Sequence, residues 1–120
     1  MRSIKPKAIV TVLWMIPLGL AFTAHVAAGD AKPNGKELYK QNCKVCHAKD
    51  SPHGEYTPIT LIQDQWRSFF KEKLVPTHKD ATVPGQPVRL LDSLTPEQMK
   101  AIEKFCVDHA ADSEQPQTCS

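Results

Sequence analysis

The apolar residues of the chain are grouped in stretches that alternate with polar or proline-rich segments. The first stretch with a helical period runs from Gly35 into the segment 43–47. Asn34 precedes it as a suitable N-cap, and Glu37 stands at the third helical position, where it favours a helix start. The residues expected on its apolar side are Leu38, Tyr39, Asn42 and Cys43. This pattern predicts a first helix that leads directly into segment 43–47.

A second helix is predicted from Ile59 to about Lys73, where large apolar side chains recur at helical spacing. Its apolar band consists of Leu61, Ile62, Trp66, Phe69, Phe70 and Leu74. So dense an aromatic group fits either a plain hydrophobic core or the wall of a bound apolar group.

The third predicted helix begins with a complete start pattern. Thr95 is a suitable N-cap, Pro96 occupies the first helical position, and Gln98 stands at the third position to complete a capping box. Its apolar face contains Met99, Ile102, Cys106 and Ala110, with Phe105 beside it. The helix is expected to end near Ala110.

Two segments carry the signals of irregular structure. Residues 48–58 contain two prolines and a glycine, and Val75 to Leu94 contains three prolines and a glycine. About twenty residues without regular structure are unusual in a small domain unless they cover a site. The whole pattern predicts an all-α fold whose helices are joined by long loops.

Residues 1–28 are expected to lie outside this domain. A basic start is followed by an almost uncharged apolar run at 8–24 and by the small residues 26–28, which is the layout of a secretory signal peptide. An uncleaved membrane anchor is the alternative, because about twenty apolar residues can span a bilayer. We therefore expect an exported, periplasmic domain at 29–112, followed by a polar tail at 113–120.

The net charge of +2 belongs mostly to the predicted leader. The leader holds three of the fifteen basic residues and no acidic one, which leaves twelve basic against thirteen acidic residues, a net charge of −1. A nearly neutral domain has no electrostatic footprint for nucleic acid.

The most specific motif is the pentapeptide Cys43-Lys44-Val45-Cys46-His47. The spacing C-x-x-C-H is the attachment signature of a c-type haem. Two thiols three positions apart can add to the two vinyl groups of a haem, and the next imidazole then lies under the iron. A zinc site built on the same three side chains is a weaker alternative, because an adjacent cysteine and histidine give poor tetrahedral geometry.

Two further cysteines, Cys106 and Cys119, remain as an even pair. In an oxidising compartment a disulfide between them is the default expectation. The closed loop is short, so the bridge would contribute about 2–3 kcal/mol, mainly by holding the tail against the domain.

The ordered set of motifs resembles the class I cytochromes c, specifically the small bacterial members with one haem. The matching segments are Gly35–Tyr39, the haem motif 43–47, the proline-containing stretch Thr57–Leu61, and Leu94–Met99 through Phe105. The resemblance implies a small cytochrome c fold, in which the N- and C-terminal helices cross and the other helices and loops surround one covalent haem.

The same resemblance implies roles for individual residues. Cys43 and Cys46 would form the thioethers, and His47 would be the proximal iron ligand. The other ring nitrogen of His47 would donate to the backbone carbonyl of Pro58, which fixes its tautomer. Tyr39 would meet Phe105 where the terminal helices cross.

The sequence departs from the family at the sixth iron ligand. The family usually provides a Met from the loop before the last helix, and Val75 to Leu94 contains none. Met99 falls within the last helix, His53 follows His47 too closely to reach the opposite face of the haem with ease, and His109 suits the end of a helix. His78, in the loop that should cover the iron, is the tentative sixth ligand, and an open or weakly ligated site is the alternative.

Two functions follow as hypotheses. The first is a periplasmic electron-transfer protein, not an enzyme, whose haem cycles between Fe(III) and Fe(II) and which meets redox proteins through weak, transient contacts. The second is a haem protein with an open sixth site that binds small gases or reacts with peroxide. Tyr56, His78 or Arg89 could provide its distal polar group.

Overall fold

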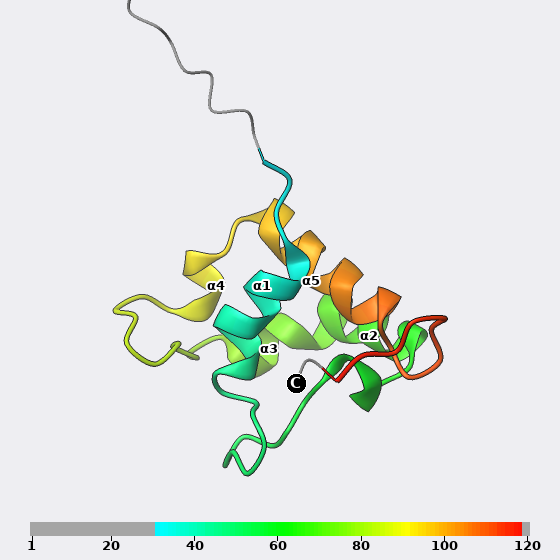
Figure 1. Cartoon of the computed structure of the whole chain (residues 1–120). Helices are drawn as coiled ribbons and strands as arrows, with labels where there is room; N and C mark the ends of the chain where they lie inside the picture. The colour runs from blue at the N-terminus through cyan, green and yellow to red at the C-terminus, as the bar shows by residue number, and fades with distance from the viewer. Residues whose placement is uncertain (1–30, 119–120) are drawn as a thin grey trace, which may run out of the picture.

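The computed structural model describes residues 31–118 of the 120-residue chain (Figure 1). The predicted leader and Cys119 lie outside the described residues. Within them the order of elements is α1 (Gly35–Tyr39), a π-helical turn (Lys40–Lys44), a 3-10 turn (Pro58–Thr60), α2 (Gln63–Ser68), a second π-helical turn (Phe69–Lys73), α3 (Leu74–His78), α4 (Leu90–Ser93) and α5 (Pro96–Asp108). The described chain contains no β-strand, only an isolated bridge between Thr82 and Arg89. This part of the chain is therefore helical, in agreement with the predicted fold class.

The first helix forms as the sequence predicts. The Asn34 side chain accepts hydrogen bonds from the backbone N–H groups of Lys36 and Glu37, at 3.1 and 3.2 Å. Two of the unpaired donors at the helix start are thereby satisfied. The π-helical turn then extends the helix to Lys44, so α1 leads directly into the haem-type motif.

Helices α1 and α5 cross at very close range (Figure 1). A Cβ atom on Gly35 would lie 2.1 Å from the backbone oxygen of Ala101, so only glycine fits at the crossing point. One turn further along, the rings of Tyr39 and Phe105 meet with centroids 5.6 Å apart. The predicted contact between these two aromatic residues is confirmed.

Helix α5 begins with the predicted capping box. Thr95 accepts a hydrogen bond from the Gln98 backbone N–H at 3.2 Å, and the Gln98 side chain accepts one from the Thr95 backbone N–H at 2.9 Å. The helix ends at Asp108, close to the predicted end. The core forms between α5, α1 and α2, and its buried side chains are Tyr39, Trp66, Ile102, Phe105, Cys106, Val107 and Ala110.

The second helical region differs from its prediction at both ends. Helical structure starts at Gln63 rather than Ile59, after the separate 3-10 turn, and continues to His78. The expectation that the irregular segment begins at Val75 is wrong, and a short helix, α4, also interrupts it at Leu90–Ser93.

The reason for the longer helix lies in the π-helical turn before α3. The Leu74 N–H donates to the carbonyl of Phe69, five residues back, instead of four. The helix thus restarts at Leu74, and Pro76 falls in the first turn of the new segment. A missing amide hydrogen is tolerated in a first turn, whereas proline inside an uninterrupted α-helix would break it.

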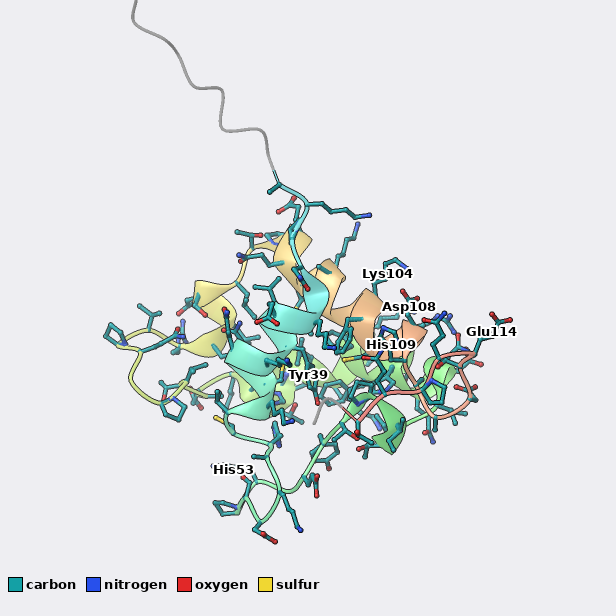
Figure 2. The ribbon with its side chains drawn as sticks, in the orientation of Figure 1. Tyr39, His53, Lys104, Asp108, His109 and Glu114 are labelled. Carbon is teal, nitrogen blue, oxygen red and sulfur yellow. The ribbon has the colours of Figure 1, made fainter. Side chains whose placement is uncertain are left out.

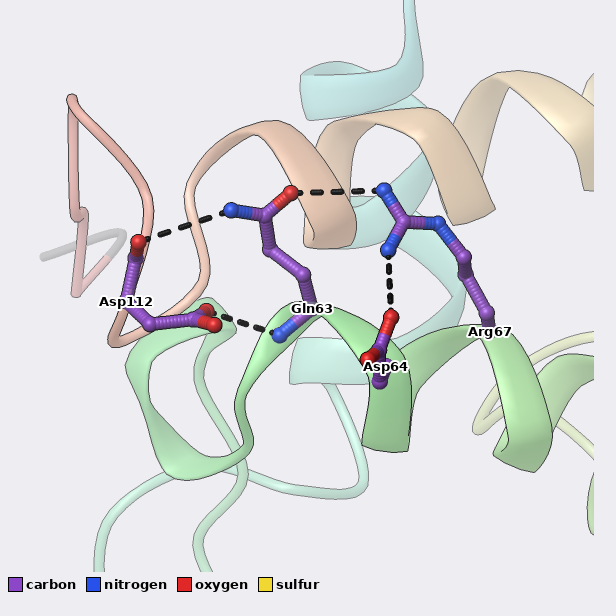
Figure 3. A network of polar contacts seen from close by, with 4 residues as sticks. All are labelled: Gln63, Asp64, Arg67 and Asp112. Carbon is purple, nitrogen blue, oxygen red and sulfur yellow. Dashed lines mark hydrogen bonds and ion pairs between the residues drawn. The ribbon is translucent and has the colours of Figure 1, made fainter.

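The segment between α5 and the tail, which contains Ala111 and Asp112, is hydrogen-bonded to the start of α2 and the residues before it (Figure 3). The Asp112 carboxylate accepts a hydrogen bond from the Gln63 backbone N–H at 2.8 Å, and the Ala111 N–H donates to the Leu61 carbonyl at 3.1 Å. Through these bonds a residue from the far end of the chain caps the start of α2.

Between residues 31 and 118, none of the helices has both the length and the apolar character needed to cross a membrane.

Candidate functional site

The haem-type motif forms a single turn at the end of the first helical region. The backbone N–H groups of Cys46 and His47 both donate to the carbonyl of Cys43, at 3.1 and 3.0 Å. These bonds place the two cysteines and the histidine within a single turn of the backbone. The arrangement is local, so the sequence spacing alone determines it.

The two thiols of the motif differ in their surroundings. Cys43 packs against the hydrophobic core, and burial together with the charge of Cys46 raises its pKa to about 12. The Cys46 sulfur points towards the 79–89 loop and lies 4.0 Å from the Thr82 carbonyl oxygen. The motif therefore has one thiol on the core side and one beneath the loop.

The ring of His47 is held by the loop that follows it. Its Nδ1 lies 3.1 Å from the carbonyl oxygen of Gly54. A carbonyl only accepts hydrogen bonds, so Nδ1 carries the hydrogen and Nε2 keeps its lone pair in the neutral ring. Gly54 has a φ of +81°, a conformation that suits glycine. The loop thus presents Nε2 of His47 for coordination.

His78 lies at the end of α3 and faces His47. It follows the buried Leu74 by one helical turn, so it shares the inward side of that helix. Its Nδ1 lies 3.1 Å from the Leu74 carbonyl oxygen, which assigns the hydrogen to Nδ1 here as well. The rings of His47 and His78 have centroids 6.0 Å apart and planes inclined at 71°.

These two rings fit a metal ion bound between them. Imidazole nitrogens bind metals at about 2 Å, so two rings on opposite sides of one ion have centroids roughly 6 Å apart. Both Nδ1 atoms already donate to backbone oxygens, which is the usual arrangement for metal-binding histidines. The residues that would hold a metal-bearing group are therefore His47 and His78, with the thiols of Cys43 and Cys46 to attach it.

The expected contact between His47 and Pro58 is replaced in the structure. The Pro58 carbonyl accepts a hydrogen bond from the Trp66 indole N–H at 2.7 Å, and both residues are buried. The glycine carbonyl in the preceding loop faces His47 instead. The aromatic Trp66 needs a buried acceptor for its N–H, and Pro58 is within its reach.

Of the other residues considered from the sequence, Tyr56 and His53 lie near His47 and the rest lie away from it. His53 is exposed in the loop, 6.4 Å from the ring of His47, and Figure 2 shows it well away from His109. His109 closes α5, and its Nδ1 lies 2.7 Å from the Gln115 carbonyl oxygen in the tail.

Met99 is half-buried on α5, and Arg89 pairs with Asp92 at 2.7 Å. Tyr56 lies beside His47, with ring centroids 5.1 Å apart.

Three contacts at the site were not predicted from the sequence. They are the carbonyls of Gly54 and Leu74 and the hydroxyl of Thr77, which lies 2.9 Å from Nδ1 of His78. The glycine in a turn-rich loop was a signal for the first. The other two depend on α3 being a helix, which the prolines of the segment concealed.

In the described part of the chain, no three or more histidine, cysteine, aspartate or glutamate side chains form a metal-binding group. Comparisons of the chain with protein families, with curated proteins and with solved structures found no match.

Proposed function

We propose that this protein is an exported electron-transfer protein of the small c-type cytochrome class. One haem would be attached through Cys43 and Cys46, and its iron would be held by His47 and His78. The observation that carries the proposal is the pair of neighbouring imidazoles, with ring centroids 6.0 Å apart, whose Nδ1 atoms both face backbone oxygens. The C-x-x-C-H spacing supports haem as the group between them.

When bound, the haem iron supplies a one-electron Fe(III)/Fe(II) couple. The chain then has to fix both axial nitrogens and limit access of water to the metal. Gly54 and Leu74 orient the two imidazoles, and the 79–89 loop lies over Cys46. No acid, base or nucleophile is needed for electron transfer, and two imidazole ligands favour a lower potential than an imidazole and a thioether.

In this proposal, the protein acts in the periplasm, and its partners are other redox proteins bound through small, transient interfaces. The near-neutral charge of the segment after residue 28 gives no reason to expect strong electrostatic attachment to them.

The test is the optical spectrum of the purified protein and of His78→Ala. Expression in a host that attaches haem should give a covalent adduct by mass spectrometry and a low-spin ferric spectrum without a sulfur-to-iron band. His78→Ala should convert the ferric iron to high spin and open the ferrous iron to carbon monoxide. His53→Ala, a histidine at similar distance from His47 but exposed, is the matched control and should keep the wild-type spectrum.

Three results would contradict the proposal in different ways. Absence of covalent haem would show that haem is not the cofactor. A low-spin spectrum unchanged by His78→Ala would show that His78 is not a ligand. A wild-type protein that is high-spin and takes up carbon monoxide freely would instead favour gas binding or peroxide chemistry at an open site.

A further inference from the structure

Thr77 has no assigned role in the proposed site, yet its hydroxyl lies among three polar atoms. Its Oγ1 is 2.6 Å from the Lys73 carbonyl oxygen, 3.2 Å from the Leu74 carbonyl oxygen and 2.9 Å from Nδ1 of His78. The residue itself is exposed on α3. Its contacts are thus polar and local, and burial does not explain its position.

The hydrogen atoms can be assigned from the chemistry of the partners. A hydroxyl has one hydrogen to donate, and both carbonyls only accept. The shorter contact, to Lys73, takes that hydrogen, so Oγ1 offers a lone pair to His78. The hydrogen on Nδ1 of His78 is therefore shared between Oγ1 of Thr77 and the carbonyl of Leu74.

The two histidines of the site differ in this respect. Nδ1 of His47 has the Gly54 carbonyl as its contact, at 3.1 Å, whereas Nδ1 of His78 has two oxygen atoms within 3.1 Å. Acceptors on Nδ1 fix the rotation of a ligating imidazole and increase the electron density on Nε2. A second acceptor therefore makes His78 a stronger donor than the backbone alone would.

We propose that Thr77 is a positioning residue that keeps His78 on the metal. The inference rests on the proposed function, since it concerns the strength of the bond between His78 and the iron. Thr77 acts only through His78, so its removal should leave haem attachment and His47 unaffected.

The test compares Thr77→Val with Thr77→Ser in the haem-loaded protein. Valine keeps the branched shape and loses the hydroxyl, while serine keeps the hydroxyl. Carbon monoxide binds ferrous iron only when His78 leaves, so its apparent affinity reports the fraction of open iron. We expect about a tenfold gain in carbon monoxide affinity in Thr77→Val, at the lower end of effects seen when a ligand's hydrogen-bond partner is removed, and the wild-type value in Thr77→Ser.

A second readout does not depend on ligand exchange. In the diamagnetic ferrous protein, the Nδ1 hydrogen of His78 should exchange with water faster in Thr77→Val than in the wild type. Val75→Thr is the matched control, because it places a branched hydroxyl at a 61% exposed position of the same helix. It should leave both measurements unchanged.

The outcomes distinguish a failure of the role proposed for Thr77 from a failure of the proposed function. Wild-type values for Thr77→Val in both measurements, in a protein where His78→Ala opens the iron, would overturn the role of Thr77 alone. An equal change in Val75→Thr would also overturn it, because the effect would then belong to the helix. If His78→Ala has no effect on the spectrum, His78 is not a ligand and both proposals fail.

Discussion

Gly35 determines how closely the two terminal helices approach each other. An added Cβ would lie 2.1 Å from the Ala101 oxygen and 2.9 Å from the Phe105 Cβ, and a backbone oxygen cannot yield as a flexible side chain does. Gly35→Ala should therefore destabilise the protein by about 1–3 kcal/mol, the usual cost of overpacking, although alanine favours helix. Urea denaturation would measure this loss.

Lys36→Ala is the control for this substitution, because Lys36 is exposed on the same turn. It should change the stability little. Equal stability of Gly35→Ala and the wild type would mean that the helices separate at no cost and that the close crossing is not needed.

The raised pKa of Cys43 predicts that the stability of the chain without attached haem depends on pH. Burial and the neighbouring Cys46 raise this pKa from 9.0 to about 12, so the folded chain holds the thiol hydrogen more tightly than the unfolded chain does. The associated stability is present below pH 9.0 and is lost as the pH rises towards about 12.

Alkylation of the chain without attached haem would check this prediction. At pH 9.0, the ordinary pKa of a free thiol, iodoacetamide should label Cys43 more slowly in the folded chain than in urea, because only the thiolate reacts. Labelling can be read by mass spectrometry of the peptide, which also reports Cys46. An equal rate in both states would contradict the raised pKa.

At the scale of single residues, the sequence was sufficient wherever a local structure depends on neighbouring positions. The spacing from Cys43 to His47 and the cap at Asn34 are of this kind. The acceptor for His47 was not predictable, because Pro58 and Gly54 both follow in the same loop and only the fold assigns the Pro58 carbonyl to Trp66.

Helix α5 depends on its start signal. The Thr95 hydroxyl satisfies the Gln98 N–H, and no other side chain in the capping box can replace it. Thr95→Ala should destabilise the protein by about 1 kcal/mol, the typical cost of losing an N-cap. Thermal or urea unfolding would measure it, and Lys100→Ala, at an exposed position inside the helix, should have a much smaller effect. A loss no greater than that of the control would show that the cap is dispensable.

At the scale of elements, the π-helical turn Phe69–Lys73 could not be predicted from the sequence pattern. A regular 3.6-residue period cannot anticipate an extra residue in one turn, and Pro76 seemed to exclude a helix. The turn allows the helix to restart, so that His78 follows Leu74 on its inward side. The helix-start signal at Thr95-Pro96 gave a correct prediction because it does not depend on the helical period of the apolar residues.

At the scale of the whole molecule, the tail stabilises an element far from it in sequence. Asp112 accepts from the Gln63 N–H at 2.8 Å, while Gln63 and Arg67 extend the network on the surface of α2 (Figure 3). Asp112→Ala should destabilise the protein by about 1 kcal/mol, because it leaves the start of α2 without this acceptor.

Urea denaturation would measure the effect of Asp112→Ala, and limited proteolysis after residue 112 should become faster. Glu114→Ala is the control, because Glu114 is an exposed tail residue close by. If the two variants are equally stable and equally resistant, the tail contributes nothing through Asp112.

The helical class was predictable, because the capped ends of α1 and α5 are visible in the sequence. The contact between Tyr39 and Phe105, where the first and last helices cross, was expected only from the family resemblance. The bonds of Ala111 and Asp112 to the start of α2 and the residues before it were not predictable, because they arise only when the core assembles around Trp66 and Ile102. His78 was expected opposite His47 only from its place in the segment that should cover the iron, and the helix that brings the two rings near each other was not expected.

The local hydrogen bonds of His47 and His78 have a consequence for the order of folding. Each imidazole is oriented by its own segment, His47 from seven residues away and His78 from four. Both halves can therefore form separately, and a metal between them would join them afterwards. That bond would close a loop of about thirty residues, which in the chain-entropy account of cross-links is worth about 3–4 kcal/mol. In the proposed holoprotein, the bond between the metal and His78 would thus act as a reversible cross-link between the two segments.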